Sequence, residues 1–258
     1  MSSILFEKKD SVAIIRLNRP EKFNSFNREM ALALQKTLDD CAIDKTVRCI
    51  YITGNGKAFC AGQDLSELTG EHAPGFDKIL SEHYNPIVSR IRNIGKPFVC
   101  AVNGVAAGAG ANIALCCDIV VATASASFIQ AFSKIGLIPD SGGTFMLPRL
   151  IGFQKASALM MLGDKVNATE AEHLGMLYKV YADEVFAEES MKLAITVAAM
   201  PTQGLAYTKE ALNASIMQSF AEQLQTEDRL QFEAAHTEDY KEGINAFIEK
   251  RPGNFKGK

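Results

Sequence analysis

The sequence predicts an α/β protein with a largely parallel sheet and a helical C-terminal part. Strand and helix signals alternate over the first two thirds of the chain, and from about residue 143 the signals are almost wholly helical. Of the 258 residues, 47% are hydrophobic and 22% are charged, as in ordinary globular proteins. Alternating strands and helices favour right-handed crossovers between parallel strands. A chain of this length can bury a sizeable core without disulfides or metal.

The first elements follow from apolar spacing. Val12 to Leu17 is predicted to be a strand that ends at the turn residues 18–20, and Asn27 is suited to cap a helix. The apolar face of that helix is spaced by three and four residues, at Met30, Leu34, Leu38 and Cys41. Val47 to Thr53 is predicted to form the next strand, and a loop with three glycines follows it.

Further elements continue the alternation. Residues 77–94 are predicted to be helical, 98–102 to form a strand and 109–116 to form a short apolar helix. Two short strands are expected at 119–122 and 128–130. Pro201 suits the start of a helix, and amphipathic segments run from there to Lys250. We therefore expect an α/β core over 1–198 and a helical C-terminal region over 199–258.

Charge and cysteine content exclude several classes of protein. Lys and Arg number 27 against 30 Asp and Glu, so the chain lacks the basic excess of a nucleic-acid-binding protein. None of the six cysteines forms a C-x-x-C pair or stands near a His at zinc spacing, which favours reduced, buried thiols and no metal site. Residues 97–117 are uncharged, but asparagines and glycines interrupt them, so a strand, a turn and a buried helix fit better than a membrane span. The N-terminus lacks the apolar core of a signal peptide, and we expect a cytoplasmic protein.

Two glycine-containing segments each follow a predicted strand directly, at 54–65 and at 103–112. Small residues let a backbone approach a ligand closely, and free N–H groups at the start of a helix favour an anion. Two such strand ends could direct N–H groups at one oxygen, as in an oxyanion hole. Tight packing of helix against sheet explains the same residues without a ligand, and the spacing by itself favours packing.

The segment Asp140-Ser141-Gly142-Gly143 invites comparison with the nucleophile motif of chymotrypsin-like proteases. We reject that interpretation, because nothing supplies the other members of a triad and the chain is not an all-β sequence. An aspartate after a proline often caps a helix, so Asp140 is either an N-cap before Thr144 or a catalytic carboxylate.

Several separated motifs, in the right order and over essentially the whole chain, resemble the crotonase (enoyl-CoA hydratase/isomerase) superfamily. They are Asn18-Arg19-Pro20 with Asn24-Ser25, Phe59 to Leu65, Ala101 to Gly104, Cys117-Asp118-Ile119, Gly136 to Gly143, and Gly243 to Phe255. The resemblance implies a crotonase-like spiral of ββα units with a helical C-terminal trimerisation region. It also implies an acyl-CoA substrate whose thioester enolate is stabilised by two backbone N–H groups. Carried over by position, those groups belong to Ala61 and Ala109.

Departures from the family pattern favour an isomerisation over a hydration. Hydratases of the family place two glutamates around the substrate, and the matching positions here hold Asn112 and Phe132, neither of which can transfer a proton. Asp140 stands where isomerases of the family carry an aspartate, so the resemblance favours Asp140 as the acid/base. Its neighbours 137–139 are apolar, and desolvation would raise its pKa.

The resemblance also implies the residues that bind the substrate and its CoA. They are Lys22, Phe23, Ser25, Gln63, Asp64, Leu65 and Phe132, with Phe247 and Lys250 reaching CoA from near the C-terminus, often across a subunit interface. Solvated surface charge explains Lys22 and Lys250 about as well. Phe247 fits ordinary helix packing equally well.

Within the family, the sequence looks most similar to isomerases that convert the ring 1,2-epoxide of phenylacetyl-CoA to oxepin-CoA. The alternatives are a Δ3,Δ2-enoyl-CoA isomerase, a hydratase of fatty acyl-CoA, and a catalytically silent acyl-CoA-binding protein. The expected partners are the acyl-CoA substrate and further copies of the chain, as a homotrimer or a hexamer, with no nucleic acid or membrane. No cofactor is expected beyond the coenzyme A of the substrate.

Overall fold

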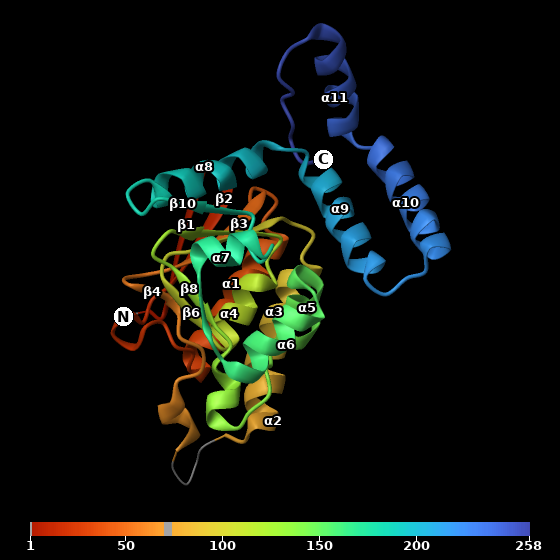
Figure 1. Cartoon of the computed structure of the whole chain (residues 1–258). Helices are drawn as coiled ribbons and strands as arrows, with labels where there is room; N and C mark the ends of the chain where they lie inside the picture. The colour runs from red at the N-terminus through yellow and green to blue at the C-terminus, as the bar shows by residue number, and fades with distance from the viewer. Residues whose placement is uncertain (1, 70–73) are drawn as a thin grey trace.

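The computed structural model describes residues 2–69 and 74–258, in which the strands form two sheets (Figure 1). The larger sheet has six strands in the order β1-β2-β3-β5-β7-β10. Their bounds are β1 Ile4–Lys9, β2 Val12–Leu17, β3 Cys49–Gly54, β5 Phe98–Val102, β7 Ile119–Thr123 and β10 Lys179–Tyr181. Only β1 runs antiparallel to its neighbour, and the remaining pairs are parallel, as the alternation of strands and helices predicts.

Helices cover both faces of this sheet. Helix α1 (Arg28–Ile43) begins after Asn27, whose side chain accepts the N–H of Met30 at 3.0 Å, and it buries the predicted apolar face. Alternate residues of β2 point to opposite faces, so Ala13 and Ile15 belong to the core that includes α1. Val12 and Ile14 belong to a second apolar cluster, which includes residues of helix α8 (Phe186–Ala199).

The smaller sheet brings the two glycine-containing segments together. Its strands lie in the order β4-β6-β8-β9, with bounds β4 Ala58–Cys60, β6 Val105–Ala107, β8 Ser127–Ile129 and β9 Lys165–Asn167. Cys60 pairs with Ala106, so the loop after β4 lies beside the start of helix α4 (Ala109–Leu115). The approach is close: a Cβ at Gly62 would lie 3.0 Å from the carbonyl oxygen of Ala107 and 3.6 Å from the nitrogen of Ala109.

The predicted helix over 77–94 is divided into three parts. They are α2 (Phe76–Lys78), the π-helical segment η3 (Ile79–Tyr84) and α3 (Asn85–Asn93). Pro86 has no N–H and its ring crowds the preceding turn, so the regular ladder of α-helical hydrogen bonds cannot pass through this point. The wider π-helical segment η3 ends two residues before Pro86, and its Ile79, His83 and Tyr84 are buried.

The other connecting elements are short helices, and some strands fall outside the sequence prediction. The helices are η1 Pro20–Lys22, η2 Leu65–Leu68, η4 Ala131–Ile135, α5 Gly143–Ile151, α6 Phe153–Leu162 and α7 Ala168–His173. The prediction of an almost wholly helical chain after residue 143 is wrong at β9 and β10, which have three residues each. Before residue 143, the sequence analysis also did not predict the strands β1, β4 and β6.

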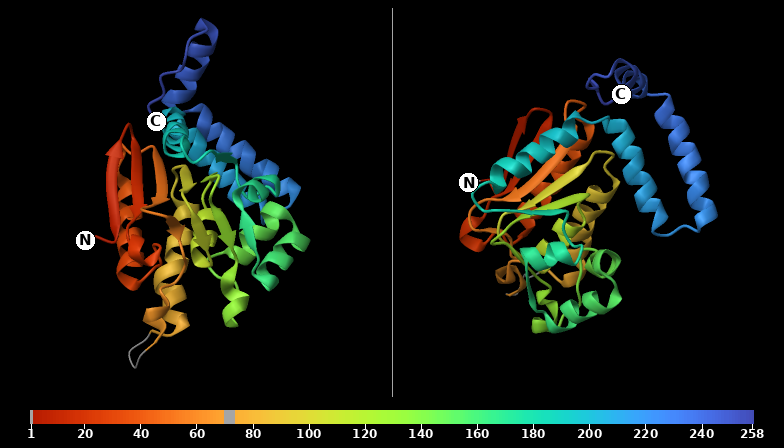
Figure 2. Two further views of the ribbon diagram at one scale, coloured as in Figure 1. Left: turned by 60° about the vertical axis from the view of Figure 1, so that its left-hand side comes forward. Right: turned by 45° about the horizontal axis from the view of Figure 1, so that its top comes forward.

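Three C-terminal helices extend away from the sheets: α9 (Thr202–Ser215), α10 (Phe220–Ala235) and α11 (Glu238–Glu249), as Figures 1 and 2 show. An ion pair of the buried Lys209 fastens α9 to the core, because its Nζ lies 2.9 Å from a carboxylate oxygen of Asp118. The division at residues 198 and 199 stays a prediction. In residues 2–69 and 74–258, no helix is long and apolar enough to cross a bilayer.

Candidate active site

A cavity of about 220 Å³ lies where the loop after β4, the start of α4, η3 and η4 meet. Its lining is mostly apolar, and Asp140 is the one carboxylate among its described lining residues. The lining residues are Ala61, Gly62, Gln63, Leu65, Leu68, Phe76, Ile79, Tyr84, Gly108, Ala109, Ala131, Phe132, Lys134, Ile135, Leu137 and Asp140. The structure thus brings together six of the predicted site residues: Asp140, Ala61, Ala109, Gln63, Leu65 and Phe132.

The two predicted N–H donors differ in availability. Ala109 is the first residue of α4, where no preceding helical turn accepts its N–H. At Ala61 the structure corrects the prediction, because its N–H already donates to the carbonyl oxygen of Phe23 at 3.0 Å. Gln63, two residues further along, also lines the cavity, and within the described residues no protein group accepts its backbone N–H. Gln63 and Ala109 therefore offer the pair of N–H groups.

The carboxylate of Asp140 does not cap a helix. Helix α5 has Gly142 as its N-cap residue, and no side chain accepts an N–H of its first turn. Burial raises the pKa of Asp140, and a hydrogen bond of 2.8 Å from the Ser141 hydroxyl to Oδ1 opposes part of that rise. A half-buried carboxylate with a raised pKa, facing a cavity, is suited to general acid/base work.

The two positions that carry glutamates in hydratases of the family have no carboxylate. Asn112 is fully buried in α4, where its side chain bonds to protein groups: Gln130 and the carbonyl of Asp140. Phe132 lines the cavity and packs against the backbone at Gly108, where an added Cβ would lie 3.7 Å from the ring. The site therefore has one proton carrier of the aspartate or glutamate type among its described lining residues.

One wall of the cavity carries Tyr84, a polar side chain that the sequence analysis did not include, next to the predicted Gln63. The hydroxyl of Tyr84 in η3 donates to Gln63 Oε1 at 2.8 Å, and Gln63 Nε2 donates to Glu67 at 3.2 Å. Burial raises the pKa of Tyr84 well above its usual value, so its hydroxyl keeps its proton. Phe76 and Ile79 reach the cavity from the same stretch of chain. Pro86 was the available sequence signal, since a proline inside a predicted helix marks irregular backbone.

The predicted CoA residues near the N-terminus lie on two joined loops. Arg19 donates to Asp64 at 2.8 Å and to the Ser25 carbonyl at 2.6 Å, which ties residues 19–25 to the loop after β4. Burial by itself would raise the pKa of Asp64, but hydrogen bonds from Ser66 and Arg19 outweigh it and lower the pKa to about 2. The carboxylate of Asp64 is thus engaged by protein groups, whereas Lys22, Phe23 and Leu65 are exposed beside it.

Phe247 and Lys250 lie far from this cavity within one chain. Both are exposed at the end of α11, and Figures 1 and 2 place α11 at the opposite end of the molecule from α2, whose Phe76 lines the cavity.

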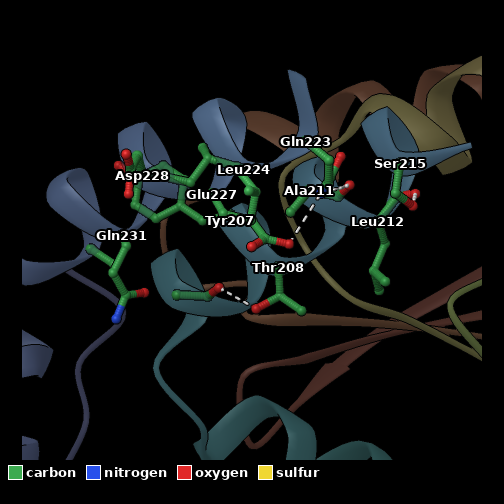
Figure 3. Close-up of a pocket in the computed structure, with 13 residues that line it drawn as sticks. Tyr207, Thr208, Ala211, Leu212, Ser215, Gln223, Leu224, Glu227, Asp228 and Gln231 are labelled. Atoms are coloured by element: carbon green, nitrogen blue, oxygen red, sulfur yellow. Dashed lines mark hydrogen bonds between the residues drawn. The ribbon is translucent and has the colours of Figure 1, made fainter. Parts of the chain in front are cut away.

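A larger groove of about 780 Å³ lies between α9 and α10 (Figure 3). Glu227 and Asp228 line this groove, and its lining residues, all of them in the described chain, include no Lys or Arg. An acyl-CoA carries several negative charges on its phosphates, so the groove is poorly suited to bind one. The smaller cavity with Asp140 is the candidate active site.

Two backbone N–H groups and the half-buried carboxylate of Asp140 line one cavity and define an acid/base site that can stabilise an enolate. Comparisons with known proteins identify the family. The family profile described as Enoyl-CoA hydratase/isomerase matches residues 7–258, so the chain belongs to that family and acts on acyl-CoA. The α/β fold predicted from the sequence, of the crotonase type, is confirmed.

Individual relatives cover the whole chain. The 1,2-epoxyphenylacetyl-CoA isomerase of Escherichia coli (strain K12) is 45% identical over 262 residues, with 100% of each chain covered. A probable enoyl-CoA hydratase of Rhodobacter capsulatus is 39% identical, with 99% of this chain and 98% of that protein covered. Among solved structures, a putative enoyl-CoA hydratase/isomerase from Mycobacterium abscessus has a TM-score of 0.93 at 33% identity, over 99% of this chain and 100% of that one.

Proposed function

We propose that the protein is an acyl-CoA isomerase that converts 1,2-epoxyphenylacetyl-CoA to oxepin-CoA. The observation that carries this proposal is that Asp140 is the one carboxylate among the described lining residues of the cavity, while the two positions of the hydratase glutamates hold Asn112 and Phe132. Hydration needs a pair of groups to position and split water, whereas an isomerisation needs one group that removes a proton and returns it. The printed name of the E. coli relative supports the same reaction.

The residues support the following sequence of steps. The N–H groups of Gln63 and Ala109 bind the thioester oxygen, and Asp140 removes a proton from the carbon next to the thioester carbonyl. The electron pair moves onto the thioester oxygen, where the two N–H groups stabilise the enolate. The pair then returns from the oxygen to form a double bond between the side-chain carbon and the ring, and the carbon–carbon bond shared by ring and epoxide breaks. The electron pair of that bond shifts through the two ring double bonds to the ring carbon on the other side of the attachment point, to which Asp140 returns the proton, and the seven-membered ring results. No atom is gained or lost, and no cofactor is needed beyond the CoA of the substrate.

The size and lining of the cavity support binding of the acyl group alone. Its volume of about 220 Å³ is below the roughly 300–1,000 Å³ that pockets for drug-sized ligands occupy. We propose that the ring occupies this space between Phe132, Tyr84 and Leu137 and that the CoA lies outside, along the exposed Lys22, Phe23 and Leu65. Ser25 and Asp64 would shape that path through their bonds with Arg19.

Three substrates test the proposal. Crotonyl-CoA should be hydrated poorly, a 3-enoyl-CoA should have its double bond moved, and the phenylacetyl-CoA epoxide, made in situ by an epoxidase, should give the oxepin thioester. Because substrate and product share one mass, chromatography or ultraviolet absorbance must be the readout. Efficient hydration of crotonyl-CoA with no effect on the epoxide would overturn the proposal in favour of a fatty-acid hydratase.

A Δ3,Δ2-enoyl-CoA isomerase is the second candidate, because moving a double bond needs only the same two N–H groups and one proton carrier. The apolar, aromatic lining from Phe76, Phe132 and Tyr84 favours a ring over a linear chain. Turnover of the 3-enoyl-CoA with none of the epoxide would favour this candidate. A silent binding protein would turn over neither.

We propose a homotrimer, or a hexamer built from two trimers, as the assembly. The C-terminal region of the described chain leaves large apolar side chains exposed: Leu212, Met217, Phe220, Leu224, Phe232, Ile244, Phe247 and Ile248. An exposed apolar surface of this extent marks an interface. Association would also let Phe247 and Lys250 of one subunit reach the CoA of another.

A further inference from the structure

The side chain of Asn112 joins three parts of the fold. It is fully buried in α4, its Nδ2 donates to the carbonyl oxygen of Asp140 at 2.9 Å, and its Oδ1 accepts from Gln130 Nε2 at 2.8 Å. The bond from Gln130 fixes the orientation of the amide, because it occupies the oxygen and directs the NH₂ group toward Asp140. A carboxylate at this position would instead set an acceptor against the Asp140 carbonyl.

The turn that carries Asp140 has strained backbone and packs on this amide. Ser141 and Gly142 have φ values of +50° and +75°, and a left-handed conformation at a serine is strained. Gly143 lies directly over the amide, where an added Cβ would be 2.3 Å from Nδ2, and its own N–H donates to the Asp140 carbonyl at 2.8 Å. Cys116, the residue after the end of α4, contributes only a weak contact of 3.5 Å from its thiol to the Ser141 carbonyl.

The same helix begins at Ala109, whose N–H is one of the two proposed enolate donors. Residue 112 follows residue 109 by less than one helical turn, a rise of about 4.5 Å. Helix α4 therefore carries the proposed N–H donor at its first residue, Ala109. Three residues later it carries Asn112, whose amide bonds to the backbone of Asp140. The bond from Asn112 joins the helix that carries the donor to the backbone of the residue that carries the carboxylate.

We infer that Asn112 is a positioning residue, whose amide sets the place of the Asp140 carboxylate relative to the N–H of Ala109. Asn112 does not line the described cavity, so it acts through Asp140 and not on the substrate. This inference rests on the proposed function, because it requires Asp140 to transfer the proton. Hydratases of the family have a glutamate where this chain has Asn112. In this protein the Asn112 amide positions the carboxylate of Asp140.

Steady-state kinetics of three variants test the inference on the 3-enoyl-CoA and on the epoxide. N112A removes both bonds, and Q130L removes the bond that orients the amide. Y51F is the matched control, because it removes a buried hydrogen bond of 2.9 Å to Ser190 between β3 and α8, outside the cavity lining. Thermal unfolding of all three variants measures the stability that each loses.

N112A should lower kcat by roughly 10- to 100-fold, since a shift of about 1 Å in a catalytic group can cost 100-fold. KM should change by less than about threefold, because the backbone donors and the cavity lining remain. Q130L should show a smaller loss of the same kind, and Y51F should keep the wild-type kcat.

Three outcomes overturn the inference: N112A with wild-type kcat, a loss confined to KM, or an equal loss of kcat in Y51F. If N112A does not fold, a folded Q130L with wild-type kcat also overturns it. Wild-type enzyme inactive on both substrates would instead refute the proposed function, and with it the role of Asn112.

Discussion

Asp140 combines the properties that a single acid/base needs. It lines the cavity, burial raises the pKa of its carboxyl, and the turn that holds it is supported from α4. We expect D140N to lower kcat by roughly 10²–10⁴-fold, the usual contribution of a positioned acid/base group. Binding of a CoA ester should survive, because the enolate donors are backbone groups. Isothermal titration together with initial rates measures both quantities, and activity within a few-fold of wild type would remove Asp140 from the mechanism.

The pH profile provides a second test at the same residue. Asp140 must be ionised to accept a proton, so the rate should fall as the pH drops through its raised pKa. The Ser141 hydroxyl stabilises the ionised form, and S141A should raise the pKa further. The acid limb of kcat against pH should therefore move to higher pH in S141A. A limb that stays in place or moves to lower pH would show that the hydroxyl does not control this group.

Sequence reasoning located the segments of the site but did not select every group correctly. The resemblance to the family predicts Asp140 and Ala109 as site residues, and both line the cavity; their catalytic roles stay a prediction. Ala61 was misassigned, since the sequence does not show that the carbonyl of Phe23 folds onto its N–H. Tyr84 was not predicted, because the π-helical turn that buries it depends on how Pro86 interrupts the helix.

At the scale of elements, α9 is held to the core by charge as well as by packing. Lys209 is buried, pairs with Asp118 at 2.9 Å and donates to the carbonyl of Ile91 at 2.6 Å. K209M removes the donor to the Ile91 carbonyl, whereas Asp118 keeps its ion pair with Arg92 at 3.3 Å. Because a buried polar group left without its partner costs roughly 1–3 kcal/mol, K209M should lower the free energy of unfolding by an amount in that range, as measured by urea denaturation at fixed protein concentration.

The control for this variant is K192M, because Lys192 pairs with Glu188 and Glu189 on the exposed face of α8. Exposed pairs of this kind contribute little, so K192M should unfold at the wild-type urea concentration. Equal behaviour of the two lysine variants would mean that the bond to Asp118 does not fasten α9.

Sequence patterns predict the long elements of this fold better than the short ones. Helix α1 was predicted with its cap and its buried face, because sixteen residues carry a regular apolar spacing. Strands β9 and β10 have three residues each and lie at the edges of the two sheets. Three residues are too few to show a period of two, and pairing with β8 and β7 decides their conformation.

At the scale of the whole molecule, the C-terminal helices keep the two predicted CoA residues near the C-terminus away from the cavity of their own chain. Phe247 lies on α11 and Lys250 directly follows it, and α11 is at the opposite end of the molecule from α2, whose Phe76 lines the cavity (Figure 1). If they bind CoA, they must do so for another subunit of the proposed trimer. Sedimentation should accordingly show a trimer or a hexamer, and a stable monomer at micromolar concentration would contradict this arrangement.

Mixed assemblies test the contribution between subunits directly. D140N lacks the acid/base, and the double variant F247D/K250E reverses the character of the distant CoA contacts, so each should be nearly inactive by itself. In assemblies formed by co-expression, a complete site combines two different chains. The double-variant chain supplies Asp140, and the D140N chain supplies the intact α11. Random pairing makes about one quarter of the sites complete, so activity should return to that order. If the residues acted within one chain, every mixed assembly would stay inactive, because no single chain would carry both intact parts.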